Sequence, residues 1–188
     1  MKFTILFTVA ALVSASAQVG MKQSAAVAAK PAGIASTDKP GMSLQAMTEL
    51  EKEMDSRLSA TGAVNNDPSL VLAGTRGVYI SGFGAVFTAD LDLVNTPLGA
   101  GLFATPISAE QKANTHKRKL AHVPMLQQTM RDMLLSLAAS PALKIADNDQ
   151  IVLAVRLMYR PWEDTKDLPS QILMRLDRRG AQPKVEVQ

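Results

Sequence analysis

The stretch "GVYISGFGAVFTADLDLV", Gly77 to Val94, carries the clearest pattern in the chain. After its glycines, apolar residues alternate with small or polar ones as far as Leu93, a period of two that is typical of a half-buried strand. The apolar residues around Tyr79, before the glycines, predict a second, shorter strand. Ser81-Gly82 is a recognised turn pair, because glycine adopts positive φ without steric cost. The stretch therefore predicts a β-hairpin.

The Gly-aromatic-Gly centre of the same stretch also raises the alternative of a phosphate-binding loop. Such a loop requires a strand, a glycine-rich turn and then a helix whose N-terminus binds the anion. Here the glycines lead into a strand pattern, so no helix N-terminus is expected at that point. The hairpin is the favoured interpretation.

Elsewhere in the chain, two more strands and two helical regions are expected. Residues 151–159, "IVLAVRLMY", are apolar on nearly both faces, and residues 170–179, "SQILMRLDRR", alternate again, so we expect an antiparallel pair. Apolar residues at three- and four-residue spacing predict a helix over 43–60. A second helical region begins at Ser108, and Pro124 either ends it, kinks it or begins another helix.

This order predicts an α+β fold with two layers: a mostly antiparallel sheet built from two hairpins, with helices packed on one face. The expected boundaries are a signal peptide at 1–17, a flexible Ala/Ser/Pro/Lys linker at 18–41, a single α+β domain at 42–180 and a frayed C-terminal tail at 181–188.

The N-terminus has the three parts of a secretory signal. Lys2 supplies the positive end, residues 3–13 form a short apolar run, and Ala15-Ser16-Ala17 fits the cleavage rule, with Gln18 as the new N-terminus. The apolar run is shorter than the ~20 residues that span a bilayer, although an uncleaved anchor remains the alternative. We expect an exported protein, in the periplasm or outside the cell, with no transmembrane span in the mature chain.

Composition excludes several function classes. The chain has no cysteine, which excludes disulfides, thiolate nucleophiles and cysteine-ligated metal sites. The formal charge is only +3, so nucleic acid is an improbable partner. No cofactor is expected.

The Gly77–Val94 stretch together with "DNDQIVLAVRLMYRPWEDTKDLPSQILMRLD", residues 147–177, resembles a group of uncharacterised bacterial exported proteins with a Gly-aromatic-Gly β-hairpin. The resemblance covers about residues 75–178. It implies a fold and an exported location, but that group has no assigned activity, so no catalytic residue follows from it.

Two sets of residues are weak candidates for chemistry. Asp90 and Asp92 lie two apart on one predicted strand, so both carboxylates point the same way and a divalent cation could bridge them. The alternative is the solvated face of a strand, because only two ligands can be named. His116 and His122 lie six apart and do not share a helix face, so both are expected at the surface.

Two charged segments are candidates for binding. "HKRK", His116 to Lys119, could contact an anionic partner, although a solvated helix face is favoured. "RPWED" contains the only tryptophan, in a loop between two strands. There Trp162, Arg160, Glu163 and Asp164 could contact a carbohydrate or a protein. The alternative is a loop anchor in which Trp162 packs on the sheet and Arg160 pairs with Glu163 or Asp164.

The favoured function is therefore an exported, non-enzymatic binding or scaffold domain, whose partner is another envelope protein or a cell-wall polymer. The alternative is a small envelope hydrolase or metal-dependent enzyme that uses Asp90 and Asp92.

Overall fold

The computed structural model describes residues 42–96, 106–141, 143–177 and 183–188, which all belong to one compact unit, Asp38–Gln188. The predicted signal peptide, its cleavage between Ala17 and Gln18, and the linker at 18–41 lie outside the described residues. Within those residues, no helix is long and apolar enough to cross a membrane.

The described elements follow the chain in an order of helix, strands, helix, strands. They are α1 (Leu44–Ser59), the 3-10 helix η1 (Ala63–Asn65), β1 (Leu70–Val71), β2 (Arg76–Ile80), β3 (Gly84–Asp92), α2 (Ala109–Ala139), β4 (Gln150–Leu157), β5 (Gln171–Asp177) and β6 (Lys184–Val187).

Both helices begin at a serine cap. The Ser43 hydroxyl accepts a hydrogen bond from the backbone N–H of Ala46 (3.2 Å), and Ser108 forms a reciprocal capping box with Gln111. Pro124 neither ends α2 nor begins a new helix, because α2 runs unbroken from Ala109 to Ala139. The proline removes one N–H from the helix, but the apolar stripe continues across it, so burial of that stripe outweighs the loss.

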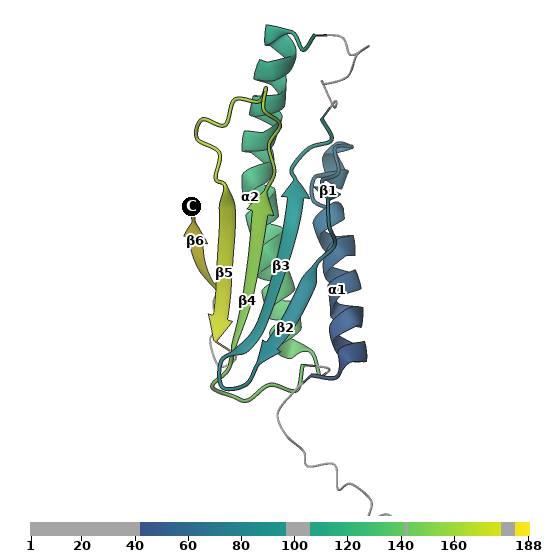
Figure 1. Ribbon diagram of the computed structural model, residues 1–188, viewed down its shortest axis with the longest axis vertical. Coiled ribbons are helices and arrows are strands. Elements are labelled where there is room, and N and C mark those ends of the chain that lie inside the picture. The colour runs from purple at the N-terminus through teal and green to yellow at the C-terminus, as the bar shows by residue number, and fades with distance from the viewer. Residues whose placement is uncertain (1–41, 97–105, 142, 178–182) are drawn as a thin grey trace, which may run out of the picture. The chain divides into compact units, whose positions relative to one another are not determined.

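The six strands form one open sheet in the order β1-β3-β4-β5-β6, with β2 also paired to β3 (Figure 1). All pairs are antiparallel except β3 and β4, which are parallel with Gly84 opposite Gln150 and Leu91 opposite Leu157. Parallel neighbours require a long crossover connection, and α2 provides it. The prediction of an α+β fold with a mostly antiparallel sheet is confirmed.

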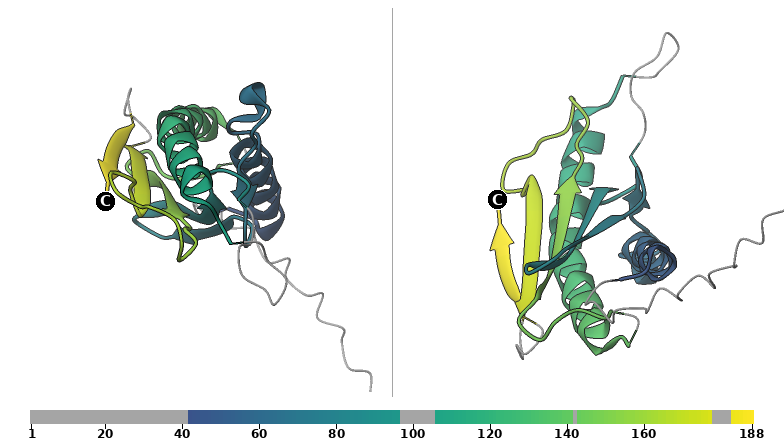
Figure 2. Two further views of the ribbon diagram at one scale, coloured as in Figure 1. Left: turned by 90° about the horizontal axis from the view of Figure 1, so that it is seen from above. Right: turned by 60° about the horizontal axis from the view of Figure 1, so that its bottom comes forward.

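The core lies between the sheet and the helices. Helix α2 contacts β4 and β5, whereas α1 contacts β1, β2 and α2, and Figure 2 shows both helices on the same side of the strands. Every second strand residue enters this core: Ala85, Phe87, Ala89 and Leu91 from β3, Ile151, Leu153, Val155 and Leu157 from β4, and Ile172, Met174 and Leu176 from β5.

The prediction of a frayed tail over 181–188 is wrong for its last residues. Lys184–Val187 form β6, which pairs antiparallel with β5, and Val185 packs against the core. The alternation of Lys184, Val185, Glu186 and Val187 is a strand pattern, but four residues are too short for periodicity alone to identify.

Candidate functional site

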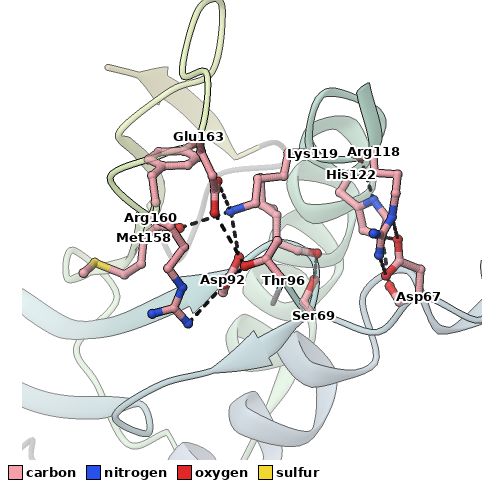
Figure 3. A network of polar contacts seen from close by, with 12 residues as sticks. Asp67, Ser69, Asp92, Thr96, Arg118, Lys119, His122, Met158, Arg160 and Glu163 are labelled. Carbon is pink, nitrogen blue, oxygen red and sulfur yellow. Dashed lines mark hydrogen bonds and ion pairs between the residues drawn. The ribbon is translucent and has the colours of Figure 1, made fainter. Parts of the chain in front are cut away.

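The carboxyl ends of β3 and β4 lie next to each other at the same end of the sheet, because these two strands are parallel. Asp92 is the last residue of β3, and Met158 to Ser170 form the loop that joins β4 to β5, which we call the β4–β5 loop. Lys119 reaches this end from α2 (Figure 3). The charged groups of three distant segments therefore come together where parallel strands end, a common position for ligand sites.

Lys119 is the centre of this charged cluster, and its side chain is completely buried. Its Nζ lies 2.8 Å from Asp92 Oδ1 and 2.5 Å from Glu163 Oε2, and it donates to the carbonyl oxygen of Met158 at 3.4 Å. Among the described residues these two carboxylate oxygens have no hydrogen-bond partner with good directional geometry, so the lysine contacts are ion pairs defined by distance. The ring of Tyr159 adds a cation–π contact, with its centroid 4.9 Å from Nζ.

Other groups complete the cluster. The Thr96 hydroxyl lies 3.2 Å from Asp92 Oδ2 and 3.5 Å from Glu163 Oε1, and Arg160 Nη2 lies 3.8 Å from Asp92 Oδ2. Two carboxylates and two cations therefore balance, as burial of charge requires. Burial, and then the charges of Glu163 and Asp92, raise the pKa of Tyr159 well above its ordinary value.

The structure gives most of the residues of the "RPWED" segment different contacts from those expected of a loop anchor. Arg160 approaches Asp92 rather than Glu163 or Asp164, and Glu163 pairs with Lys119. The Asp164 carboxylate accepts from the N–H of Lys166 at 3.0 Å. Trp162 is half-buried, and its Nε1–H is enclosed without a hydrogen-bond partner in the described part of the chain. The segment is thus tied to β3 and α2, which fixes its conformation.

Asp90 and Asp92 do not share a ligand position, because each carboxylate already has its own cation. Asp90 accepts two hydrogen bonds from Arg156, at 2.8 and 2.6 Å, and these bonds hold the pKa of Asp90 below its ordinary value. Asp92 is paired with Lys119. Among the described residues no group of three or more histidine, aspartate or glutamate side chains is placed to hold a metal ion.

The expectation that both histidines lie at the surface is wrong for His122. Its ring is buried, with Nδ1 2.8 Å from the carbonyl oxygen of Arg118 and Nε2 2.9 Å from that of Asp67. Because carbonyl oxygens only accept, both contacts are hydrogen bonds only when both ring nitrogens carry protons. His116 is partly exposed, and its Nδ1 lies 2.9 Å from the carbonyl oxygen of Asp164.

The "HKRK" segment is not a uniformly solvated helix face. Lys117 is exposed, but Lys119 is buried, and Arg118 forms a two-bond pair with Asp67, with Nε 2.9 Å from Oδ2 and Nη2 2.5 Å from Oδ1. The hydrogen bond from Arg118 is the main cause that lowers the pKa of Asp67. The segment therefore attaches α2 to its neighbours.

A signal for Lys119 was present in the sequence. The buried positions of α2 follow a helical stripe from the apolar half back into the polar half, and they are Thr115, Lys119, His122, Leu126, Met130, Met133, Leu134 and Leu137. Extending the stripe back from Leu126 would have placed Lys119 and His122 on the buried face.

A second surface is formed by the strand residues that alternate with the core residues. Val78, Val86 and Val152 lie side by side across β2, β3 and β4. Val78 is 51% exposed and Ile80 47%, and Phe83, in the turn after β2, is 42% exposed. We call Val78 and Ile80 the hairpin patch. Large apolar side chains that are half exposed and close together typically mark an interaction surface.

A shallow hollow of about 360 Å³ adjoins this surface, with polar groups at its edge. It is lined by Ala73, Gly74, Arg76, Thr88, Ala89, Asp90, Ala154, Arg156 and Gln171. Arg76 is exposed and forms no ion pair with any residue that the structure describes. The charged cluster is closed to solvent, whereas the hairpin patch and the hollow are accessible.

Comparison of the chain with family models, with curated proteins and with solved structures found no significant match.

Proposed function

We propose that this chain is an exported, non-enzymatic binding or scaffold domain that recognises its partner through the sheet face opposite the two helices. The observation that carries the proposal is the hairpin patch, in which Val78 is 51% and Ile80 47% exposed. An antiparallel sheet with one solvated face is normally polar on that face. Here β2 instead carries two apolar side chains, Val78 and Ile80, that are 51% and 47% exposed.

The surroundings of the patch fit an interface. Protein interfaces combine an apolar centre with a polar rim. Val78, with the partly buried Val86 opposite it, belongs to the apolar centre. The Asp90–Arg156 ion pair and Arg76, which pairs with no acid in the described part of the chain, line the adjacent hollow. The partner surface is expected to be largely apolar, with an acidic group that reaches Arg76.

The positions of the reactive side chains favour binding over catalysis. Asp92, Lys119 and Glu163 are buried in ion pairs that fix the β4–β5 loop, and His122 is held between two carbonyl oxygens. Groups used in this way stabilise a rigid scaffold. The signal-like N-terminus, Lys2 to Ala17, directs the proposal to a partner in the cell envelope or outside the cell.

The proposal is tested with two charge substitutions of equally exposed apolar residues. Ile80 is 47% exposed in the hairpin patch, and Leu135 is 45% exposed on α2, away from the proposed surface. The tagged protein is expressed in its exporting cell with Ile80→Asp or Leu135→Asp, and co-purified proteins are compared.

We expect Ile80→Asp to remove the co-purified partner and Leu135→Asp to retain it, with both variants keeping the melting temperature of the parent. Loss of the partner in both variants, or in neither, would contradict the proposed surface.

A further inference from the structure

Strand β6 leaves one edge of the sheet unpaired in the described part of the chain. It is the last strand in the sheet order, and its only strand partner is β5 (Figure 1). An unpaired edge is a template for another strand. The sequence of β6 decides which strand fits it.

The direction of each backbone group in β6 follows from one reciprocal pair. Gln188 donates to the carbonyl oxygen of Gln171 at 3.0 Å, and Gln171 donates to that of Gln188 at 3.2 Å. Backbone groups of an antiparallel strand alternate in direction. The backbone N–H and C=O groups therefore point to β5 at Lys184, Glu186 and Gln188. They point to the free edge at Val185 and Val187.

This alternation leaves few registers in which a second copy of β6 pairs antiparallel. The two-fold axis must lie at a residue that faces its own copy. An axis midway between two residues would place a residue whose backbone groups point to the free edge opposite one whose backbone groups point to β5, and the two strands could not form hydrogen bonds there. An axis at Lys184 opposes Lys184 to itself, and an axis at Glu186 opposes Glu186 to itself, and like charges directly opposite are unfavourable. An axis at Val185 opposes Lys184 to Glu186 of the other copy, twice.

The register centred on Val185 also matches the remaining residues. Val185 faces its own copy, and Val187, which is 51% exposed, faces Pro183. The outward N–H groups of Val185 and Val187 then find carbonyl acceptors, and the missing N–H of Pro183 falls at the outer end of the pairing. The pairs that Lys184 and Glu186 form with Asp177 and Arg175 are solvent-exposed, so both charges remain accessible.

We propose that two copies of this chain associate through β6, antiparallel about a two-fold axis at Val185, so that their sheets become continuous. The axis is perpendicular to the sheet, so the hairpin patches of both copies face the same side. The competing interpretation is that Lys184 and Pro183 protect the edge from pairing, as charges and prolines do in many edge strands.

The test uses sedimentation of the full mature chain over a concentration series up to about 1 mM, which detects association as weak as that expected of a small interface. We expect a monomer–dimer equilibrium. Lys184→Glu and Glu186→Lys each create two like-charge contacts and should each weaken the dimer about tenfold. The double variant with both changes restores opposite charges and should recover the parent's dimer.

Val185→Pro removes an outward N–H and leaves the residues that bond to β5 unchanged, so it should give a monomer, with a lowered melting temperature because Val185 also packs against the core. If that variant fails to fold, the charge series decides alone. A parent that stays monomeric across the series, or a double variant as weak as the single ones, would overturn the proposal.

Discussion

Lys119 joins three distant segments of the chain through one buried side chain. It is a cation without solvent contact, between an acid that ends β3 and an acid in the β4–β5 loop. An isolated buried charge is very unfavourable, so the three side chains depend on one another. Lys119 is therefore one of the residues of α2, together with His116, that hold the β4–β5 loop.

Lys119→Met should destabilise the fold by about 3–5 kcal/mol, because two buried carboxylates lose their main cation. Lys117→Met, two residues away on the exposed side of α2, is the control and should change stability by less than about 0.5 kcal/mol. Urea unfolding measures both. Adding Asp92→Asn and Glu163→Gln to the Lys119→Met variant should recover much of the loss, and a Lys119→Met variant as stable as the control would contradict the pairing.

Gly62 and Gly82 form a matched pair for a second test, because both have positive φ, at 80° and 79°. A Cβ on Gly62 would collide with His122 and with the carbonyl oxygen of Asp67, whereas a Cβ on Gly82 would have no atom within 4 Å. Gly82→Ala should therefore cost only the backbone term of about 1–2 kcal/mol. Gly62→Ala should cost clearly more in thermal or urea unfolding, and equal losses would show that His122 is not packed against Gly62.

At the residue scale, sequence reasoning failed where polar residues occupy an apolar stripe. Lys119 and His122 lie on the buried face of α2, but their polarity and the neighbouring basic residues indicated solvent. Asp90 and Asp92 were weak candidates for a shared cation, with a solvated strand face as the alternative, yet each pairs with a cation from another element. The period of a strand predicts which face of the sheet a side chain lies on. It does not predict which cation from another segment pairs with that side chain.

At the scale of elements, α2 holds the molecule together through contacts with loops on two sides. Arg118 and His122 bind the segment after η1, and His116 and Lys119 bind the β4–β5 loop. The sequence predicted the hairpin elements β2 and β3 well, because nine residues of alternation in β3 follow a glycine turn. It did not identify β6, which is too short for such a signal, or the continuity of α2 through Pro124.

The Arg118–Asp67 pair predicts a dependence of stability on pH. The hydrogen bond from Arg118 lowers the pKa of Asp67 in the folded state below its ordinary value. The contribution of the pair is therefore fully present above the unfolded-state pKa and is lost as pH falls through the lower folded-state pKa. Asp67→Asn should reduce stability at neutral pH by about 1 kcal/mol, since Arg118 is partly screened by solvent.

Urea unfolding of the parent and of Asp67→Asn from pH 7 to pH 2 measures this effect. The two stabilities should begin to converge as the pH falls below about 4 and should meet only below the lowered pKa of Asp67 in the folded state, where the parent's carboxylate is protonated. Arg118→Met in the Asp67→Asn background is the control, and it should leave the shape of the pH curve unchanged. A constant difference between parent and variant across the range would contradict the assigned pair.

At the scale of the whole molecule, the parallel pairing of β3 and β4 determines which segments meet at the ends of these strands. It places the ends of two strands and the β4–β5 loop at one end of the sheet, where the charged cluster forms. The strand–helix–strand order of β3, α2 and β4 contained the signal for this pairing, since a long helical crossover permits parallel neighbours. Because both helices cover the other face of the sheet, the hairpin patch stays accessible to solvent. The sequence could not show this, since the alternation of apolar and polar residues does not predict which face of a sheet the helices cover.

Site-specific photo-crosslinking in the exporting cell tests the use of this sheet face most directly. A photoreactive residue at position 80 lies in the hairpin patch, and one at position 135 lies on the exposed side of α2 with similar exposure. We predict a discrete crosslinked product from position 80 and none from position 135. A product from position 135 alone, or the same product from both positions, would contradict recognition through the open face of the sheet.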